Sequence, residues 1–574
     1  MSRRFRKRSL ALKRVPTRLG LSALLVLAGV GVLLVVQAST AGNSASWPTA
    51  GNDVGNSRTQ PLETKLSADN VGKLAVKWTF SSHGDVSATP TVANGIVYFP
   101  DWGGYVNAVN ADTGALVWEK KVSELPGATA TARSRTSPAV YGNEVIFGDN
   151  YGLPQSGGAH IYAVNAQTGA LLWSTQVDSN SAAVITANPV VADNKLIVGV
   201  SSNEEAAALF ADFGIITYHC CTFRGKVLAL DPATGAVLWA TYTVPQTTAA
   251  ASLDTNNPCT GTTYTGADPS PSGCDYSGGA VWDTPAVDVG AGRFFLGTGN
   301  NYTVPDAAAA CAQANNTSSA NCASPDDHFD SALALNLSNG HIDWSYKAEG
   351  WDAWTVSCAF LQPGTTWCPS PESPDFDFGG SGPNLITVNG PKGTKQKLVG
   401  LGQKSGVYWA FDETTGAVVW NTLVGPGAAL GGIEWGTAYD GRRIYVPLSN
   451  SDHKPYTLAG GQSSTAGSWA ALDPGTGKIS WQVPTPDGAA LAIGAASVAN
   501  GVVYVGDSAA SGNNMFALDA ANGKTLWSFA ASGSVWSAPA IANGVLYWGS
   551  GYSAVGPPGE SGDHTFYAFS LNGK

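Results

Sequence analysis

One recurring phrase constrains the fold of this chain more than any other feature of its sequence. Its first whole copy is Ala108-Val-Asn-Ala-Asp-Thr-Gly114-Ala-Leu-Val-Trp118. Further whole copies end at Trp173, Trp239, Trp344, Trp420, Trp481 and Trp527. One more copy is divided between the two ends of the chain, because Tyr567 to Lys574 has the turn without its tryptophan and Lys73 to Trp78 has the tryptophan without its turn. We therefore expect the two ends to complete a single unit.

Each copy has the pattern of two antiparallel strands joined by a tight turn. Apolar residues alternate before an Asp/Asn-x-x-Thr/Asn-Gly turn, where glycine supplies the positive φ that the turn needs. A second hairpin signal follows most copies, as at Asn94-Gly95, Asn500-Gly501 and Asn543-Gly544. Units of about 40 residues or more with two hairpins each are typical of propeller blades. The sequence therefore predicts an all-β, eight-bladed propeller, with the tryptophans packed between sheets and the ring closed by pairing N-terminal and C-terminal strands.

The first 45 residues differ in kind from the rest of the chain. Eight Lys and Arg residues between Arg3 and Arg18 precede an apolar run from Leu19 to Ala38. This pattern is typical of an export signal cleaved near residues 38–41, or of an uncleaved N-terminal membrane anchor. Both alternatives predict an exported protein, periplasmic, extracellular or at the cell surface, with one propeller domain at residues 46–574.

The composition of that domain fits a globular β protein. The chain is 44% hydrophobic and 13% charged and contains 69 Gly. Only residues 204–213 and 306–315 have a short helical pattern. Without the eight N-terminal positive charges, 23 Lys and Arg remain against 42 Asp and Glu, a net charge of −19. That charge argues against nucleic acid as a partner. It would suit a basic electron carrier, and it would equally keep an exported protein in solution.

The eight cysteines form four pairs that are local in the sequence: Cys220/Cys221, Cys259/Cys274, Cys311/Cys322 and Cys358/Cys368. After an export signal, this spacing predicts disulfides within each loop. Three of the pairs would staple long insertions. The adjacent pair would form either a strained ring or two free buried thiols. A Cys-x-x-Cys-His motif is missing from the sequence, so a covalently bound c-type haem is not expected.

Three further motifs, together with the repeat, resemble quinoprotein alcohol dehydrogenases that bind pyrroloquinoline quinone (PQQ). The segments Cys220 to Asp231, Pro374 to Gly379 and Gly431 to Gly436 look most like polyvinyl-alcohol dehydrogenases. The resemblance covers the chain after residue 46. It implies PQQ- and calcium-dependent oxidation of secondary alcohol groups, in polyvinyl alcohol or a similar polyol, to ketones. Electrons would pass to an external cytochrome c or another acceptor.

The resemblance also assigns site residues one by one. Ser201 would touch the quinone and Glu204 would ligate calcium, with Glu205 as the alternative ligand. Asn300 would be the second side-chain ligand, and Trp282, eighteen residues earlier, would form the floor under the PQQ ring. The other expected cofactor contacts are Arg135, Thr186, Cys220, Cys221, Lys404 and Trp435, and Glu434 would join Trp435 at the rim of the site.

Two aspartates compete for the role of general base. Asp377 lies at the family's distance before Lys404, which matches the cationic partner of the quinone. The resemblance therefore assigns Asp377 as general base and metal ligand, with Asp352 as the alternative base and Asp375 as a supporting carboxylate. Asp377 would take the hydroxyl proton, while the metal and Lys404 would polarise a quinone carbonyl.

The sequence departs from the family in three ways. The adjacent cysteines of small-alcohol dehydrogenases lie in an earlier blade, whereas Cys220 and Cys221 follow the insertion that carries Glu204. Ser87 stands where small-alcohol dehydrogenases have a glutamate that touches PQQ. Gly379 stands where some relatives have a lanthanide-binding acid, which favours calcium here.

Two other functions stay open at the level of sequence. One is a non-catalytic exported propeller that acts as a scaffold for protein assembly. The other is a carbohydrate-binding surface that uses Trp351, Trp354 and Trp367. Insertions at 242–281, 301–331 and 349–383 are expected to surround one mouth of the ring and to shape the substrate site.

Overall fold

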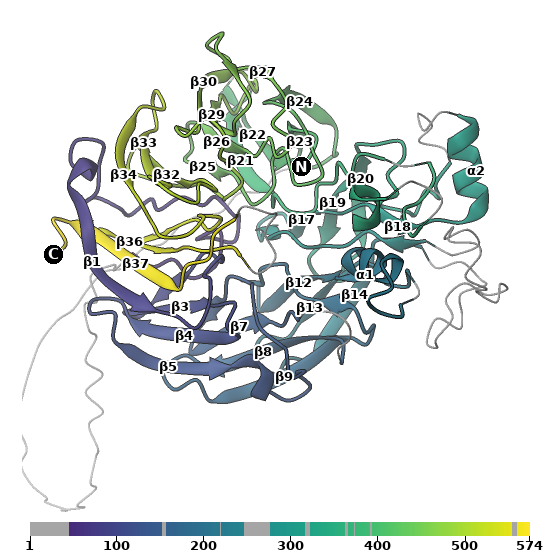
Figure 1. Ribbon diagram of the computed structural model, residues 1–574, viewed down its shortest axis with the longest axis horizontal. Coiled ribbons are helices and arrows are strands. Elements are labelled where there is room, and N and C mark those ends of the chain that lie inside the picture. Colours follow the sequence, from purple (N-terminus) through teal and green to yellow (C-terminus); the bar gives the residue numbers. More distant parts are fainter. Residues whose placement is uncertain are drawn as a thin grey trace, which may run out of the picture. The chain divides into compact units, whose positions relative to one another are not determined.

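Eight four-stranded antiparallel sheets surround a common axis (Figure 1). The structure is a computed structural model that describes residues 45–151, 157–218, 220–245, 276–315, 322–361, 366–371, 373–390, 393–553 and 560–574. The eight-bladed all-β propeller predicted from the sequence is confirmed. Within the described ranges, no helix is long and apolar enough to cross a membrane.

The first four blades follow one another along the chain, and each runs from an innermost to an outermost strand. Blade 1 consists of β2 (Thr91–Ala93), β3 (Ile96–Pro100), β4 (Tyr105–Asn110) and β5 (Leu116–Lys121). Blade 2 consists of β6 (Ala139–Tyr141), β7 (Glu144–Gly148), β8 (Ala159–Asn165) and β9 (Leu171–Asp178). Blade 3 consists of β11 (Val190–Ala192), β12 (Lys195–Ser202), β13 (Lys226–Leu230) and β14 (Val237–Tyr242), and β12 also pairs with β10 (Ala183–Val184). Blade 4 consists of β16 (Ala286–Asp288), β17 (Arg293–Gly297), β19 (Ser331–Asn336) and β20 (Ile342–Lys347).

The second half of the ring repeats this plan. Blade 5 consists of β21 (Asn384–Asn389), β22 (Lys395–Gly402), β23 (Val407–Asp412) and β24 (Val418–Leu423). Blade 6 consists of β25 (Ala438–Tyr439), β26 (Ile444–Leu448), β29 (Ser468–Leu472) and β30 (Ile479–Pro484). Blade 7 consists of β31 (Ser497–Ala499), β32 (Val502–Gly506), β33 (Met515–Asp519) and β34 (Thr525–Phe529). Two short pairs lie outside the blades: β15 (Ser277–Gly278) with β18 (Asn301–Thr303), and β27 (Tyr456–Thr457) with β28 (Ser463–Ser464).

Blade 8 joins the two ends of the chain. It contains β35 (Ala540–Ala542), β36 (Val545–Gly549), β37 (Thr565–Leu571) and, as the outermost strand, β1 (Leu74–Ser81). In the antiparallel register, Leu74 faces Leu571 and Trp78 faces Ala568. The predicted closure by terminal strands is confirmed, because the divided copy of the repeat is completed in this one sheet.

The two most regular residues of the repeat touch each other across neighbouring blades. The indole Nε1 of Trp118 in β5 donates a hydrogen bond to the carbonyl of Ala166, in the turn of blade 2, at 2.8 Å. Gly169 of that turn has a φ of 67°, and a Cβ there would lie 2.9 Å from the Trp118 ring. Glycine is thus required by the turn and by the tryptophan that packs on it. The prediction that the repeat tryptophans pack between sheets is confirmed.

The segment before β1 contacts every blade, a feature that the sequence did not suggest. We call residues 45–60 the N-terminal clasp. Its hydrogen bonds reach the blades in chain order, through the pairs Trp47 and Val92, Pro48 and Val140, Thr49 and Pro189, Val54 and Val287, Gly55 and Leu385, Ser57 and Tyr439, Arg58 and Val498, and Gln60 and Ile541. Most of these partners belong to the innermost strand of a blade. On the side that faces the propeller axis, the backbone groups of that strand would otherwise be unpaired. The clasp therefore ties all eight blades together around the axis.

The long insertions pack against one another beside blades 3 and 4. Helix α1 (Glu204–Asp212) contacts η4 (Val356–Ala359), and α2 (Asp306–Ala314) joins a separate apolar cluster with residues of the other insertions. Both predicted helices are confirmed. Two further single turns are η1 (Val71–Lys73) and η2 (Val122–Glu124). Three of the predicted disulfides are present, Cys220–Cys221, Cys311–Cys322 and Cys358–Cys368, whereas Cys259 and Cys274 lie outside the described residues.

The three tryptophans of the proposed carbohydrate-binding surface lie inside this region. Trp351, Trp354 and Trp367 are only 4%, 8% and 8% exposed. That interpretation is wrong, because these rings are buried within the fold and are not presented to solvent.

Candidate active site

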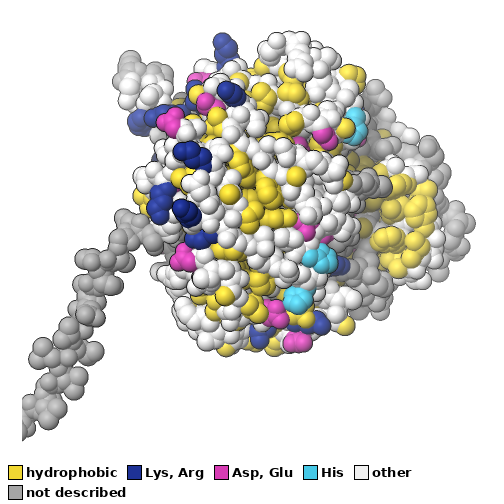
Figure 2. Space-filling model, turned by 60° about the vertical axis from the view of Figure 1, so that its left-hand side comes forward, with side chains coloured by type: hydrophobic (Ala, Val, Ile, Leu, Met, Phe, Trp, Pro, Cys, Tyr) yellow, Lys and Arg dark blue, Asp and Glu magenta, His cyan; other side chains and the backbone are white. Residues whose placement is uncertain are grey.

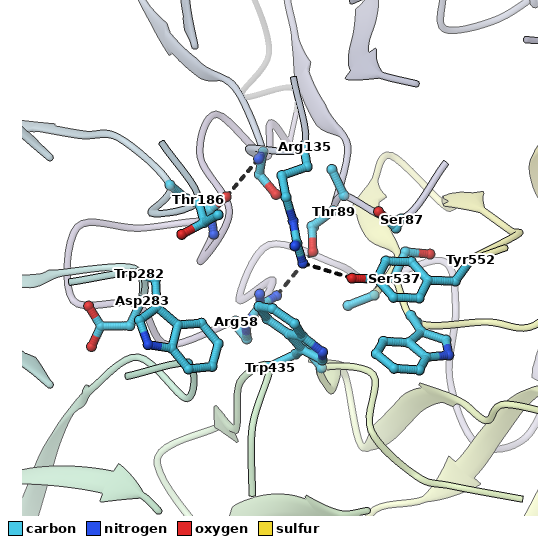
Figure 3. Close-up of a pocket in the computed structure, with 17 residues that line it drawn as sticks. Arg58, Ser87, Thr89, Arg135, Thr186, Trp282, Asp283, Trp435, Ser537 and Tyr552 are labelled. Carbon is cyan, nitrogen blue, oxygen red and sulfur yellow. Dashed lines mark hydrogen bonds between the residues drawn. The ribbon is translucent and has the colours of Figure 1, made fainter. Parts of the chain in front are cut away.

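A cavity lies on the propeller axis (Figure 3). It is lined by residues that immediately precede the innermost strands, one contribution from each blade: Thr89, Ser137, Asn188, Asp283, Gly380, Trp435, Ala495 and Ser537. Four of the predicted cofactor residues, Arg135, Thr186, Trp282 and Trp435, line the same cavity.

Aromatic rings and one guanidinium form much of the cavity wall. Arg135 donates a hydrogen bond to the hydroxyl of Tyr552 at 2.9 Å, and its guanidinium lies 5.0 Å from the centre of the Trp435 ring. Trp435 meets Trp282 edge-on at 5.3 Å. The indole Nε1 of Trp435 is buried and has no hydrogen-bond partner among the described residues. Such a wall suits a planar ligand with polar edges. An acceptor atom at the edge of this ligand would receive a hydrogen bond from Nε1 of Trp435.

Beside Trp282 lies a cluster of buried acids around one lysine. The Lys404 ammonium is 2.9 Å from Asp375 Oδ2, 3.5 Å from Asp377 Oδ1 and 5.3 Å from the centre of the Trp282 ring. Its backbone N–H donates to the carbonyl of Asp377, which fixes the turn after β22 to the loop before β21. Burial alone would lower the pKa of Lys404, but Asp375, Asp377 and Glu434 outweigh it and raise that pKa well above its ordinary value.

The two candidate bases differ in what they already bind. Oδ1 of Asp377 has no hydrogen-bond partner among the described residues. Burial raises the pKa of Asp377 well above its usual range, and the Lys404 ammonium opposes this rise. Asp352 instead accepts hydrogen bonds from the Ser373 hydroxyl and, at 2.8 Å, from the backbone N–H of Phe376. Asp352 therefore holds the loop that carries Asp377, and Asp377 keeps an oxygen available for chemistry.

The adjacent glutamates at the start of α1 point to different partners. Glu204 accepts hydrogen bonds from the Tyr218 hydroxyl at 2.6 Å and from the backbone N–H groups of Thr222 and Phe223 at 2.8 Å. These bonds occupy both of its oxygens and fix the segment that carries the Cys220–Cys221 disulfide. Glu205 is half-buried; burial raises its pKa, and its further electrostatic partners are Asp375, Lys404 and Asp377. Glu205, the alternative residue, thus lies within electrostatic reach of the acid cluster.

Asn300 lies next to the residue that contacts Asp377, and its side chain has an oxygen available. Asn300 donates through Nδ2 to the carbonyl of Trp354 at 2.8 Å, which leaves its Oδ1 as an acceptor. A Cβ on the neighbouring Gly299 would lie 3.1 Å from Asp377 Oδ2. In the described parts of the chain, no group of three or more His, Cys, Asp or Glu side chains is arranged to hold a metal by itself. A hard cation would therefore need the amide of Asn300 and oxygens of the cofactor in addition to Glu205 and Asp377.

The structure explains the glycine at the position where some relatives have an acid. A Cβ on Gly379 would lie 1.8 Å from the Nε1 of Trp282. No side chain fits there unless the indole moves.

The remaining expected contacts lie around the same indole. The hydroxyls of Thr186 and Ser201 are 2.5 Å apart, so Ser201 reaches the cavity through Thr186. Cys220 and Cys221 belong to an apolar cluster against which Trp282 packs. Ser87 lines the cavity and accepts a hydrogen bond from the Trp102 indole at 2.8 Å. Sequence reasoning missed one basic and one acidic residue of the cavity, Arg58 and Asp283. Arg58 escaped because the clasp has no repeat or motif that would single it out.

Fold and site together define a propeller enzyme with a buried acid–lysine cluster beside a cavity for a planar ligand. Comparison with known proteins agrees. A family profile described as outer membrane protein assembly factor BamB matches residues 65–214 and 465–574. Polyvinylalcohol dehydrogenase from Sphingopyxis sp. (strain 113P3) is 30% identical over 575 residues, which cover 93% of this chain and 77% of that protein. Polyvinylalcohol dehydrogenase from Pseudomonas sp. is 29% identical over 559 residues, with 92% and 77% covered.

A solved structure shares the fold. Quinohemoprotein alcohol dehydrogenase ADHIIG from Pseudomonas putida HK5 superposes with a TM-score of 0.65 at 19% identity, covering 92% of this chain and 81% of that one. The chain belongs to the family of quinoprotein alcohol dehydrogenases that includes the polyvinyl alcohol dehydrogenases. This membership confirms the expected enzyme class, a PQQ-dependent alcohol dehydrogenase.

Proposed function

We propose that this enzyme oxidises secondary alcohol groups, in polyvinyl alcohol or a similar polyol, to ketones with PQQ and Ca²⁺. The observation that carries the proposal is the buried cluster of Lys404, Asp375 and Asp377 beside Trp282, at the edge of the axial cavity. The names of two relatives, both polyvinylalcohol dehydrogenases, support the substrate class.

The residues that line the cavity suit the quinone in their aromatic and polar character. Trp282 would lie under the ring system, with Trp435 at its edge and the Cys220–Cys221 disulfide close by. Arg135, Thr186 and Ser201 would bind its polar groups, and the unused Nε1 of Trp435 is a donor for one more. When bound, PQQ supplies the two-electron acceptor for the alcohol.

Calcium fits the donor chemistry next to the quinone position. Glu205, Asn300 and Asp377 would supply hard oxygen ligands, the type that Ca²⁺ prefers. Buried oxygens of Asp375 and Asp377 without hydrogen-bond partners among the described residues support a cation here. Glu204, the first-choice ligand of the sequence argument, would instead hold the Cys220–Cys221 segment in place.

Each residue of the acid–lysine cluster would have a separate role in catalysis. Asp377 would accept the proton of the substrate hydroxyl, since its Oδ1 has no hydrogen-bond partner among the described residues and lies 3.5 Å from the Lys404 ammonium. Lys404 would place a fixed positive charge where negative charge develops on the oxidant, and Asp375 would hold the ammonium in position. Asp352 would keep the Asp377 loop in register through Ser373 and Phe376. The packed insertions would limit access of water to this site.

Export and electron transfer remain part of the proposal. Residues 1–45 would act as an export signal or as a membrane anchor, outside the 46–574 propeller. An external cytochrome c or another acceptor would collect the electrons. Lys and Arg side chains gather on one side of the face that Figure 2 shows, so we expect a basic carrier to dock elsewhere.

The decisive test is titration of purified protein with PQQ and Ca²⁺, followed by dye reduction with polyvinyl alcohol and with small secondary alcohols. Saturable, quinone-dependent activity that is lost in Asp377→Asn supports the proposal and ranks the substrates. Protein with intact disulfides that binds no PQQ would instead point to the scaffold alternative.

A further inference from the structure

Arg58 is a buried guanidinium without a carboxylate partner. It is 3% exposed and lines the axial cavity (Figure 3). Its Nη1 lies 3.2 Å from the carbonyl of Ala50 and 3.4 Å from the hydroxyl of Thr89, both neutral acceptors. Among the described residues it takes part in no ion pair. A buried charge that is balanced by nothing is strongly unfavourable, so its position calls for a partner.

The N-terminal clasp holds Arg58 in this position from both sides. The Arg58 backbone N–H donates to the carbonyl of Gly51 at 2.9 Å, and the Arg58 carbonyl accepts from Val498 of blade 7 at 2.9 Å. Its φ of 51° lies in the left-handed region, which arginine seldom adopts. Because the clasp is bonded to all eight blades, this backbone is fixed and the side chain has little freedom to leave the axis.

The cavity therefore carries a net positive charge. Its charged lining residues are Arg58, Arg135 and Asp283. One oxygen of Asp283 accepts the backbone N–H of Gly297 at 2.7 Å. Burial raises the pKa of Asp283 well above its usual range, which favours the neutral acid. Two guanidiniums outweigh this single carboxyl group, so the cavity lining suits an anion.

We propose that Arg58, together with Arg135, binds a carboxylate of the quinone cofactor from within the axial cavity. This inference rests on the proposed function, since it takes the cavity as the place of PQQ. It adds a residue from outside the blade repeat, and it gives the clasp a role in cofactor binding besides closing the fold.

The test compares PQQ with its trimethyl ester, in which the carboxylates are neutralised. Binding of both compounds to the full-length protein is measured by quenching of tryptophan fluorescence in Arg58→Gln, Arg58→Lys and wild type. We expect Arg58→Gln to weaken PQQ binding about tenfold to a hundredfold, the loss typical of a hydrogen bond to a charged group. Binding of the ester should change less than about threefold, and Arg58→Lys should retain part of the PQQ affinity.

Arg442→Gln is the matched control, because Arg442 is an exposed arginine in the turn between β25 and β26 and should leave both affinities unchanged. Equal losses for PQQ and its ester in Arg58→Gln would overturn the inference, because a residue that only supports the fold does not discriminate between the two ligands. Wild type that binds neither compound would defeat the proposed function, and the inference with it.

A structure of the wild-type complex tests the same point without any variant. A guanidinium nitrogen of Arg58 within about 3.2 Å of a PQQ carboxylate oxygen supports the assignment. Separation of the two by more than one intervening water refutes it.

Discussion

The axial cavity and the acid cluster adjoin at Trp282, yet they have opposite charge. The cavity presents two guanidiniums and a carboxyl group whose pKa is raised by burial. The cluster presents several carboxylates around Lys404. One region is suited to anions and the other to a cation. A ligand that carries carboxylates at one end and coordinates a metal at the other would satisfy both regions, as the proposed PQQ–Ca²⁺ pair does.

The largest expected effect comes from the acid with a free oxygen. Asp377→Asn should lower kcat by about 10² to 10⁴-fold, because the variant cannot accept the hydroxyl proton. Steady-state dye reduction measures this loss. Asp352→Asn is the control: it should destabilise the loop and affect kcat less, because Asp352 already binds Ser373 and Phe376. If Asp352→Asn proved the more damaging of the two, the assignment of the base would have to be reversed.

The lysine at the centre of the cluster should set the pH dependence. The proton acceptor must be ionised, so activity rises with pH through the pKa of Asp377. The Lys404 ammonium lowers that pKa. In Lys404→Met the pKa of Asp377 rises, and the ascending limb of the pH–rate profile of the holoenzyme moves to higher pH. A limb that stays in place or moves to lower pH would show that Lys404 does not act on the base.

The two glutamates of α1 sharpen the comparison further. Glu205→Gln should weaken Ca²⁺ binding about tenfold to a hundredfold, since it removes a charged oxygen ligand beside Asp377. Calorimetric titration of the PQQ-loaded protein with Ca²⁺ measures this change in Ca²⁺ affinity. Glu204→Gln should mainly lower thermal stability, because the Glu204 carboxylate accepts hydrogen bonds from Tyr218, Thr222 and Phe223. The reverse outcome would restore Glu204 as the metal ligand.

The smallest effect is expected far from both regions. Trp118→Phe keeps the aromatic packing but removes the hydrogen bond to the carbonyl of Ala166. The Ala166 carbonyl keeps the hydrogen bond from the Tyr98 hydroxyl, so the free energy of unfolding should fall by only about 0.5 to 1.5 kcal/mol, the net value of one hydrogen bond. Chemical denaturation measures this change, while PQQ affinity and kcat should match the wild type. A marked loss of activity would mean that the blade framework is coupled to the site.

Much of the framework could be predicted because its signals are local. The turn glycines and the spaced tryptophans specify hairpins and blade contacts within neighbouring units, and Tyr567 to Lys574 with Lys73 to Trp78 indicated the closure. The same holds for the helices near residues 204 and 306 and for the short-range disulfides. The N-terminal clasp escaped prediction because its partners lie between about 40 and 480 residues away and are mostly backbone groups, which leave no pattern in the side chains.

For the site, the sequence provided a short set of candidate residues for each role, and only the folded structure distinguished among them. Glu204 and Glu205 are neighbours on one helix, and their side chains point about 100° apart, so only the packing of α1 decides which one meets Asp377. Nothing in the sequence distinguishes Trp351, Trp354 and Trp367 from exposed aromatic residues. Only the packing of the insertions buries them.

The sequence by itself determined the class of fold, the order of the blades and the residue types available for chemistry, because repeated local patterns encode local structure. Tertiary structure decided which of those residues meet. It brought Arg58 to the axis from a segment without a motif, joined Asp377 to Lys404 across two loops and separated the two adjacent glutamates. Each of these placements depends on the direction of a side chain and on contacts between distant segments. Those contacts form only when the whole ring has formed.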